Sequence, residues 1–275
     1  MHTPRLLNVR LNVRPSPQDA RDYHFRPLFA VSEIPDTLDL RKSLLPVRDQ
    51  GAQGACFACS CAVMKEYQDA TTVPLSAQYF YNQRTNLFDQ DPTNDEGMFP
   101  RDALKLLRTQ GMCLQNTYPY GSTHIIPAHA HEEARAHRIG SFVRVNTVHE
   151  LRRSLFYHGP AIICFPVYNY TKQLWRPNIE GEHRGGGHAM VVVGYDGDGF
   201  HVQNSWGPQW ADNGYTYYPL TDWGSHFECW SVVDSDTDDV LKPEDTTHED
   251  TQPHDEHTDE HTDGQWTCPA GCCIM

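Results

Sequence analysis

The stretch Asp49–Tyr67, DQGAQGACFACSCAVMKEY, decides the fold, because a Gly-rich turn leads directly into a long apolar run that begins at Ala55. Apolar residues occupy nearly every side of this run, which is the pattern of a buried central helix. Three cysteines, Cys56, Cys59 and Cys61, lie within six residues at its start. They are therefore metal ligands, a redox pair, or one nucleophile with two neighbours, and each alternative predicts a different protein.

The spacing of these cysteines separates the alternatives. On one helix they point about 0°, 300° and 140° around the axis, so three ligands cannot converge on a metal ion. Cys56 and Cys59 form a C-x-x-C pair at a helix start, where a thiol pKa is lowered, so a thioredoxin-type redox site is an alternative. That site predicts a buried strand just before it, whereas LDLRKSLLPVRDQGAQG precedes Cys56. A nucleophile instead requires a distant histidine and a group that orients it.

Helix signals dominate residues 35–145, and strand signals dominate residues 146–233. Ser76 and Pro100 begin helices, and a capping box starting at Thr147 opens another. The β-rich runs AIICFPVY, AMVVVGYD, FHVQNSW, GYTYYPL and ECWSVV follow, with a DGDG hairpin turn between the second and the third. This order predicts an α+β protein of two lobes with a cleft between them.

The two ends of the chain read differently from this compact region. Residues 1–34 are rich in Arg and Pro and read as an extended lead-in or short pro-segment. Residues 234–275 form an acidic, His-containing stretch, which we expect to be disordered. The histidines of that tail could bind divalent ions loosely, although a solvated acidic spacer is the simpler interpretation.

Composition narrows the function classes. The 275 residues, 39% of them hydrophobic, suffice for a substantial core. No apolar run approaches the ~20 residues that cross a bilayer, and we expect no secretory signal. Nine cysteines without regular pairing predict free thiols and a cytoplasmic location. Residues 234–264 hold thirteen of the 36 acids, so the remainder is nearly neutral and gives no reason to expect nucleic-acid binding.

Two later motifs supply what a thiolate nucleophile requires. GGGHAMVVVGYDG places His188 at the head of a strand, and VQNSWGPQWADNGY places Asn204 at the end of the next strand. Because the DGDG turn joins these strands, we expect them to be antiparallel neighbours with Asn204 within reach of His188. The glycines 185–187 suggest an open approach for a peptide backbone, or else a stiff structural turn.

Together, QGAQGACFA, GGGHAMVVVGYDG and NSWGPQWADNGY resemble the papain and cathepsin family of cysteine peptidases. His188 and Asn204 follow Cys56 by 132 and 148 residues, close to the ~130 to 150 typical of that family. The resemblance covers residues 35–233. It implies a papain-like two-lobe fold and a cysteine endopeptidase that hydrolyses peptide or protein substrates without a cofactor. A catalytically inactive binding protein with this fold is the main alternative, and a C-x-x-C redox protein is another.

The resemblance also implies a role for each motif residue. Cys56, at the start of the central helix, would be the nucleophile, and His188 would form an ion pair with it and protonate the leaving amine. Asn204 would orient His188, and Trp206 would lie over that contact. Gln50 would donate a side-chain N–H to the oxyanion together with the backbone N–H of Cys56.

Other positions depart from the family or refine its implications. Gln53 stands where most relatives have a cysteine, so one disulfide of secreted members cannot form. Phe57 replaces the usual Trp or Tyr and keeps a ring surface without a polar group. Cys164 and Gly186 fall near the pocket for the residue two before the scissile bond, which hints at an apolar preference. The other two cysteines of the central helix would be small core residues.

Histidines and C-terminal cysteines suggest two further features. Four histidines lie in the expected crossover between the lobes: His124, His129, His131 and His137. They could form a zinc or pH-sensing site, although an exposed loop is the simpler interpretation. At the C-terminus, CPAGCCIM places Cys272 four residues from the end, as in a farnesylation motif. A second acyl group, for which Cys268 is available, would be needed for stable membrane attachment; otherwise we expect a soluble cytoplasmic protein.

Overall fold

The computed structural model describes most of the chain, namely residues 9–20, 22–24, 33–84 and 95–234. All described residues lie within one unit of the chain, Met1–Leu241. The acidic tail from residue 235 onward, with its histidines, Cys268 and Cys272, lies outside the described residues.

Most helices lie in the first part of the described chain and most strands in the second, as the sequence predicts. The helices of the described residues are α1 (Cys56–Gln68), α2 (Ala77–Asn82), α4 (Pro100–Gln110), α5 (Ala128–Ala134) and α6 (Val148–His158), with short 3-10 turns η1 (Arg41–Ser43), η2 (Arg135–His137) and η3 (Leu220–Asp222). The strands are β1 (Leu38–Asp39), β2 (Ile139–Arg144), β3 (Ala161–Val167), β4 (Gly186–Tyr195), β5 (Gly199–Gln203), β6 (Tyr215–Pro219) and β7 (Glu228–Asp234).

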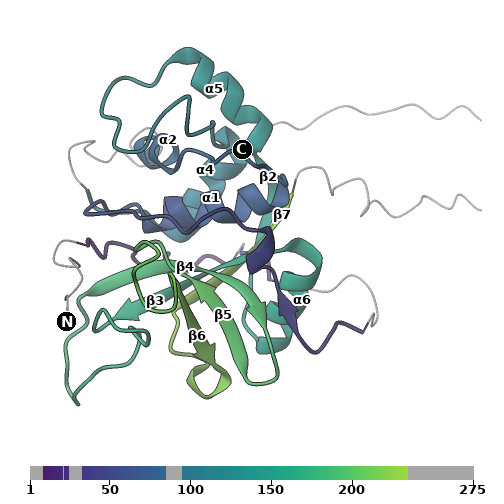
Figure 1. Cartoon of the computed structure of the whole chain (residues 1–275), viewed down its shortest axis with the longest axis vertical. Coiled ribbons are helices and arrows are strands. Elements are labelled where there is room, and N and C mark those ends of the chain that lie inside the picture. Colours follow the sequence, from purple (N-terminus) through teal and green to yellow (C-terminus); the bar gives the residue numbers. More distant parts are fainter. Residues whose placement is uncertain (1–8, 21, 25–32, 85–94, 235–275) are drawn as a thin grey trace, which may run out of the picture. The chain divides into compact units, whose positions relative to one another are not determined.

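The strands form one antiparallel sheet in the order β2-β7-β3-β4-β5-β6, and β1 pairs with β4. In Figure 1 the helices α1, α2, α4 and α5 lie together on one side of the sheet, and α6 lies apart from them. A helical region beside an antiparallel sheet confirms the predicted α+β class.

Side chains of β3 alternate between two hydrophobic cores. Ile162 and Cys164 pack in a core with α1, α2 and α4, whereas Ile163 and Phe165 pack in a second core with Leu151 of α6. Successive residues of a strand point to opposite faces, so α1 and α6 cover opposite faces of the sheet. The central helix α1 is buried from Cys56 to Met64, as its apolar sequence predicts, and the charged Lys65 and Glu66 are buried as well.

Local capping signals are confirmed. The Ser76 hydroxyl accepts the Tyr79 N–H (2.9 Å) at the start of α2. Thr147 and Glu150 form the reciprocal capping box at the start of α6. Gly111 ends α4 with φ +73°, a conformation that favours glycine.

Two predictions for residues 124–144 need correction. Strand β2 lies in the region expected to be mainly helical. The sequence did not indicate it, because β2 pairs with β7, some 90 residues away. The expected exposed loop of histidines contains α5 and η2 instead. His131 Nδ1 lies 3.0 Å from the Tyr79 hydroxyl, and His137 Nδ1 lies 2.6 Å from Asp69 Oδ2. Within the described ranges, no group of three metal-ligating side chains is gathered in one place.

Candidate active site

Cys56 is the first residue of α1 and follows the turn that Gln50 begins. Its side chain is fully buried. The backbone N–H of Ala189 in β4 donates toward the Cys56 sulfur. Since Ala189 follows His188 directly, this contact places the thiol beside the part of β4 that carries the predicted catalytic histidine.

His188 and Asn204 meet as the hairpin predicts. β4 and β5 pair antiparallel, and His188 Nε2 lies 2.6 Å from Asn204 Oδ1. The same amide oxygen accepts the Ser205 N–H (2.7 Å), which fixes it as the acceptor and therefore makes Nε2 the donor. The Trp206 ring lies over His188, 4.6 Å between centroids. The neutral imidazole thus keeps its Nδ1 lone pair available to take a proton.

His188 Nδ1 is buried and makes no hydrogen bond within the described part of the chain. The predicted ion pair between Cys56 and His188 is therefore not formed in this state. Burial raises the pKa of Cys56 to about 12, although the Ala189 N–H favours the thiolate. Burial also lowers the pKa of His188 to about 4, against the opposing effect of its bond to Asn204. Both groups are uncharged near neutral pH.

Gln50 is held by Ser205, a contact that the sequence analysis missed. The Ser205 hydroxyl donates to Gln50 Oε1 (2.6 Å), and Gln50 Nε2 donates to the Gln53 carbonyl (2.9 Å). A side-chain amide has two N–H donors, so this arrangement commits one of them. Ser205 lies between Asn204 and Trp206 in the NSW motif, and this position could have indicated that it belongs to the site.

The chain's own N-terminal part fills the place expected for an open cleft. Residues 9–16, here called the cleft segment, run parallel to the start of β4. The Val13 N–H donates to Gly187 O (3.1 Å), and the Gly187 N–H donates to Leu11 O (3.3 Å). Val13 is 2% exposed and belongs to the same buried cluster as Cys56. A Cβ at Gly54, two residues before Cys56, would lie 3.1 Å from Asn12 Nδ2, so the cleft segment passes beside the start of α1 as well as beside β4.

Glycines on both sides make room for this segment. A Cβ at Gly187 would lie 1.9 Å from Val13 O, and a Cβ at Gly97 would lie 2.3 Å from Asn12 O. Contacts this short exclude a side chain at either position without displacement of the backbone. The glycines before His188 therefore border a polypeptide backbone, as their sequence suggested, but the approach is occupied.

The remaining predicted residues are buried. Phe57 is fully buried in the helical core and presents no free ring surface. Cys59 and Cys61 are buried core residues, as predicted, and the described cysteines are all free thiols. Cys164, opposite Ala189 in the sheet, packs in the cluster that contains Val13, and Gly186 contacts the Leu11 backbone. Gly186 therefore lies beside the cleft segment, and Cys164 lies in the neighbouring strand β3.

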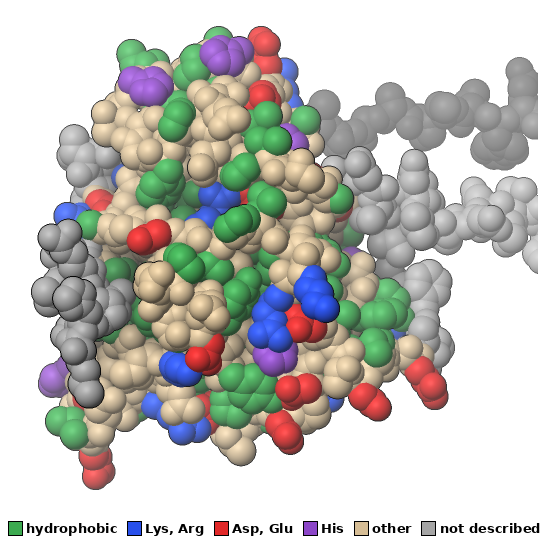
Figure 2. All heavy atoms as spheres, in the orientation of Figure 1, with side chains coloured by type: hydrophobic (Ala, Val, Ile, Leu, Met, Phe, Trp, Pro, Cys, Tyr) green, Lys and Arg blue, Asp and Glu red, His purple; other side chains and the backbone are tan. Residues whose placement is uncertain are grey.

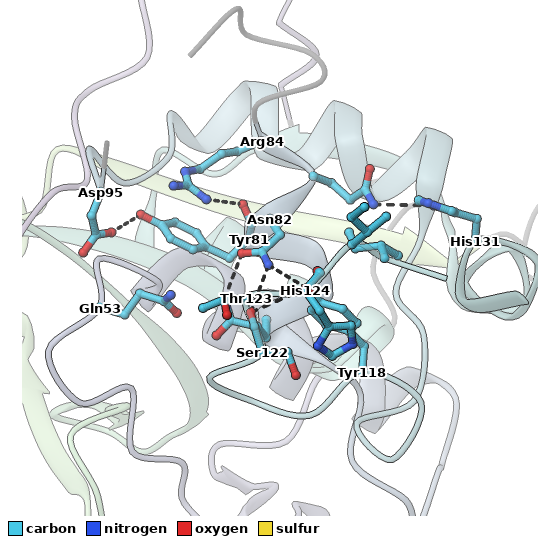
Figure 3. A pocket seen from close by; sticks show the side chains of 14 residues that line it. Gln53, Tyr81, Asn82, Arg84, Asp95, Tyr118, Ser122, Thr123, His124 and His131 are labelled. Carbon is cyan, nitrogen blue, oxygen red and sulfur yellow. Dashed lines mark hydrogen bonds between the residues drawn. The ribbon is translucent and has the colours of Figure 1, made fainter. Parts of the chain in front are cut away.

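One cavity among the described residues lies in the helical region, and its lining does not include Cys56 or His188. It measures about 640 Å³ and has a polar lining that includes Gln53, Asn82, Asp95 and His124. Figure 3 shows the Tyr81 hydroxyl, part of this lining, pointing toward Asp95. On the face in Figure 2, acidic and basic side chains lie close to one another. None of the helices in the described ranges is both long and apolar enough to cross a bilayer.

Comparison with known proteins agrees with this geometry. Papain from Carica papaya is 27% identical over 189 residues, which cover 66% of this chain and 54% of papain. Cysteine proteinase 3 from Entamoeba histolytica is 25% identical over 201 residues, covering 68% and 63% of the two chains, and cathepsin 7 from Mus musculus is 28% identical over 210 residues, covering 68% and 61%. The chain thus spans less than two thirds of the length of these relatives.

Solved structures show the same fold. Xylellain, a cysteine protease from Xylella fastidiosa, superposes with a TM-score of 0.73 at 22% identity over 85% of this chain and 99% of its own. The Carica candamarcensis cysteine protease CMS1MS2, solved in complex with E-64, gives a TM-score of 0.57 at 22% identity, over 73% of this chain and 99% of its own. The family described as papain family cysteine protease matches residues 34–223. With the fold, the His188–Asn204 contact and this match in agreement, the chain belongs to the papain family of cysteine proteases.

Proposed function

We propose that this chain is a cysteine endopeptidase whose nucleophile is Cys56 and whose general acid and base is His188. The observation that carries the proposal is the bond from His188 Nε2–H to Asn204 Oδ1 beneath Trp206. It leaves Nδ1 as the proton acceptor in a ring that cannot turn without losing that bond. Cys56 at the N-terminus of α1 is placed where the helix dipole favours a thiolate.

The reaction begins when the cleft segment gives way to a substrate. Water and substrate then relieve the burial that keeps both groups neutral, and the thiol proton moves to His188 Nδ1. The thiolate attacks the carbonyl carbon of the scissile bond and forms a tetrahedral intermediate. Its oxyanion accepts hydrogen bonds from the backbone N–H of Cys56 and from the Gln50 side chain, a contribution of about 3 kcal/mol in comparable sites.

His188 then returns its proton to the leaving amine, and the C–N bond breaks to leave a thioester on Cys56. Neutral His188 next removes a proton from a water molecule, which attacks the thioester carbonyl carbon. Collapse of the second intermediate releases the carboxylic acid product and restores the thiol. Throughout, Asn204 holds the ring through Nε2, and Trp206 shields that bond from water.

We also propose an apolar preference at the subsite that Cys164 and Gly186 border. Val13 is the chain's own occupant of this region, where it packs in a cluster with Cys164 and Ala189. Charged side chains would lose hydration there without a described partner. Profiling with a peptide library tests this: enrichment of Val, Leu or similar residues two positions before the cleaved bond is expected, and enrichment of charged residues would reject it.

Active-site labelling tests the catalytic assignment. The full chain and its Cys56→Ala and Cys59→Ala variants are treated with a thiol-directed epoxide and with a peptide library. Cys59 is a matched control because it is also a buried free thiol of α1. We expect Cys56→Ala to lose labelling and hydrolysis with almost unchanged thermal stability, whereas Cys59→Ala keeps both.

A binding protein without catalysis is the second candidate, because Cys56 and His188 are both buried and uncharged in this state. It predicts that neither the wild type nor a variant with a displaced cleft segment is labelled, while peptides still bind. Calorimetric titration with library peptides separates the two functions.

The C-terminal motif at Cys272, outside the described residues, supports a proposal about location. We propose a cytoplasmic protein that is tethered when Cys272 is farnesylated. Intact mass from a eukaryotic host should show a prenylated, trimmed terminus that is lost in Cys272→Ser. An unmodified terminus with all protein in the soluble fraction would leave an untethered cytoplasmic protein.

A further inference from the structure

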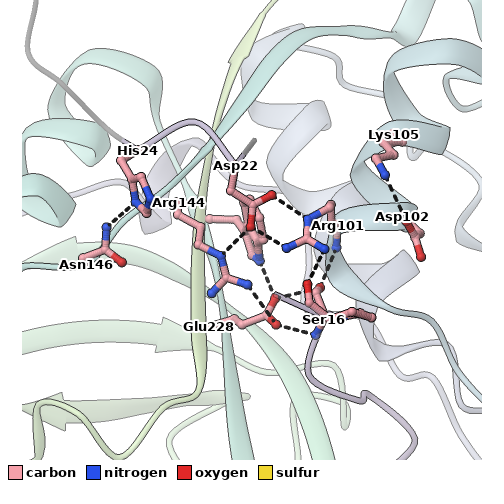
Figure 4. Close-up of polar contacts among 11 residues, drawn as sticks. Ser16, Asp22, His24, Arg101, Asp102, Lys105, Arg144, Asn146 and Glu228 are labelled. Atoms are coloured by element: carbon pink, nitrogen blue, oxygen red, sulfur yellow. Dashed lines mark hydrogen bonds and ion pairs between the residues drawn. The ribbon is translucent and has the colours of Figure 1, made fainter. Parts of the chain in front are cut away.

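Buried charges bind the part of the lead-in that follows the cleft segment. Asp22 lies between two arginines, Arg101 in the first turn of α4 and Arg144 at the end of β2 (Figure 4). Arg101 Nε donates to Asp22 Oδ1 (2.5 Å), and Arg144 Nε donates to Asp22 Oδ2 (3.1 Å). Arg101 also donates to the Pro17 carbonyl. The lead-in is thereby joined both to the helical region and to the sheet.

Ser16 makes a second connection to the same group of residues. Its N–H donates to Glu228 Oε1 (2.5 Å), its hydroxyl donates to Glu228 Oε2 (3.1 Å), and that hydroxyl accepts the Arg101 N–H (3.1 Å). Arg144 Nη2 lies 3.3 Å from Glu228 Oε1. These five residues, Ser16, Asp22, Arg101, Arg144 and Glu228, are called the Asp22 cluster below.

The Asp22 cluster is balanced and shielded from water. Its two carboxylates face two guanidinium groups, and the side chains of Asp22, Arg101 and Glu228 are 8%, 7% and 2% exposed. Although burial opposes it, hydrogen bonds from Arg101 and Arg144 lower the pKa of Asp22. Removing one charge from such a cluster leaves the opposite charge buried without its partner, which is strongly unfavourable.

Apart from Ser16, which belongs to the Asp22 cluster, the cleft segment is held less firmly. Its two backbone hydrogen bonds to Gly187 are of ordinary length and modest net value. Its ion pairs, Arg10 with Asp95 and Arg14 with Glu96, are formed by arginine side chains that are 57% and 50% exposed, so water screens them. Buried, charge-assisted contacts of the lead-in are found instead in the Asp22 cluster.

We propose that the Asp22 cluster fastens the cleft segment over Cys56 and so sets how often the active site opens. The inference rests on the peptidase function proposed above and concerns the regulation of that same site. When the lead-in departs, Arg144 keeps Glu228, but Arg101 loses the carboxylate that faces it. The Asp22 cluster therefore opposes departure of the lead-in, although it is separate from Cys56 and His188. Weakening the cluster opens the site without altering these catalytic groups.

The electrostatics of the covered site support this role. The cleft segment passes beside both groups, because a Cβ at Gly54 would lie 3.1 Å from Asn12 Nδ2 and a Cβ at Gly187 would lie 1.9 Å from Val13 O. Burial is the first cause of the shifted pKa values of Cys56 and His188. With the segment in place the sulfur is a neutral thiol, which is a poor nucleophile. The cover thus blocks the substrate and also keeps the nucleophile inactive.

Asp22→Asn tests the proposal, because it removes the charge and nearly preserves the shape. Asp39→Asn is the matched control, since Asp39 makes a comparable two-point pair with Arg41 outside the lead-in. Labelling of Cys56 by a thiol-directed epoxide is timed in the full chain. We expect Asp22→Asn to be labelled about tenfold faster than wild type or more, and Asp39→Asn to match wild type. Equal rates for wild type and folded Asp22→Asn would overturn the proposal.

A peptide of residues 9–24 added in trans separates opening from general loosening. If Asp22→Asn reacts faster because its cleft segment has left, this peptide should slow the labelling, and a scrambled peptide should not. A variant that is merely unfolded would react quickly with either peptide, and that result would count against the proposal.

Hydrogen exchange gives a readout that does not depend on catalysis. The Val13 amide donates to Gly187 in wild type and should exchange faster in Asp22→Asn, while amides of the α6 core keep their protection. Unchanged Val13 exchange would reject the proposal even if labelling changed. If no protein is labelled yet Val13 exchange rises in Asp22→Asn, the peptidase function fails while the fastening role of the cluster stands.

Discussion

Ser205 donates its hydroxyl hydrogen to Oε1 of Gln50 across 2.6 Å, although 155 positions separate the two residues in the chain. The backbone reinforces the contact, because the Gln50 N–H donates to Ser205 O (2.8 Å). Ser205 directly follows Asn204. One short segment after β5 therefore positions both the partner of His188 and the residue predicted to bind the oxyanion.

Ser205→Ala should weaken catalysis through Gln50. Without the hydroxyl, the Gln50 amide loses the contact that fixes its orientation, so the oxyanion is bound less well while substrate binding is retained. We expect kcat to fall about tenfold with KM nearly unchanged, and Gln50→Ala to cost roughly a hundredfold in kcat. Steady-state kinetics on a peptide substrate measure both. Ser205→Thr should recover most of the loss, and a change confined to KM would contradict the positioning role.

Asn204→Ala should impair proton transfer. The buried His188 Nε2–H would lose its acceptor, and the ring could turn away from Cys56. We expect kcat/KM to fall by about a hundredfold, within the range that a positioned acid and base contributes. Asn169→Ala, an exposed asparagine that bonds within its own loop, is the control and should react like wild type. Equal kinetics for both variants would remove Asn204 from the mechanism.

Acid should favour opening of the covered site. In the closed state the pKa of His188 is about 4 instead of its ordinary 6.5, so between these values an exposed His188 binds a proton that the buried one does not. The closed state is therefore stable relative to the open state above pH 6.5 and loses that advantage as the pH falls toward 4. Cys56, with its pKa raised from 9.0 to about 12, opposes closure as the pH rises above 9.0.

The ratio of the labelling rates of wild type and Asp22→Asn isolates this effect, because the intrinsic chemistry of the epoxide cancels. The wild-type rate divided by the Asp22→Asn rate should rise below pH 6.5 and above pH 9.0, because the wild-type site then opens more often. Asn204 and Trp206 contact the His188 ring and do not titrate in this range, and Phe165 lies opposite His188 in the neighbouring strand. Near-UV circular dichroism checks that the fold is intact at each pH. A ratio that stays constant across the range would refute the linkage.

Lys65→Met should destabilise the fold where α1 ends. The Lys65 ammonium is 1% exposed and lies 2.6 Å from Asp69 Oδ1 and 2.7 Å from Asp234 Oδ1. Removing it leaves carboxylates that have lost a buried partner, and we expect a loss of about 3 kcal/mol in the free energy of unfolding. Lys172→Met, at an exposed pair with Asp212, should cost under about 1 kcal/mol. Urea denaturation compares them, and similar midpoints would contradict the assignment.

Contacts between neighbours in sequence could be predicted, and so could the site built from them. His188 and Asn204 lie on two strands joined by a short turn, so the register of one hairpin sets their distance. The cap at Ser76 and the capping box at Thr147 are likewise local. That this hairpin lies beside Cys56 was predicted only from the resemblance to papain-like peptidases, because the two segments are far apart in the chain.

Contacts between distant segments could not be predicted in the same way. β2 pairs with β7, some 90 residues further along the chain, so no neighbouring segment of the sequence indicates its partner. The lead-in has no apolar periodicity from which its path could be predicted. Its residue Ser16 is placed by Arg101 and Glu228, which lie far along the chain. The resemblance implies a thiolate at Cys56, whereas burial in this closed state raises the pKa of that thiol to about 12, an effect of tertiary packing that the sequence does not indicate.

The covalent attachment of the cleft segment determines how its occupancy responds to dilution. Because residues 9–16 belong to the same molecule as Cys56, their local concentration at the site is set by the length of the connecting chain and not by the amount of protein. A single backbone cut between residues 24 and 33 would turn this blocker into a separate, diffusible ligand. Occupancy would then depend on the protein concentration. After this irreversible cleavage, dilution would release residues 9–16 from the site, whereas in the intact chain dilution has no effect.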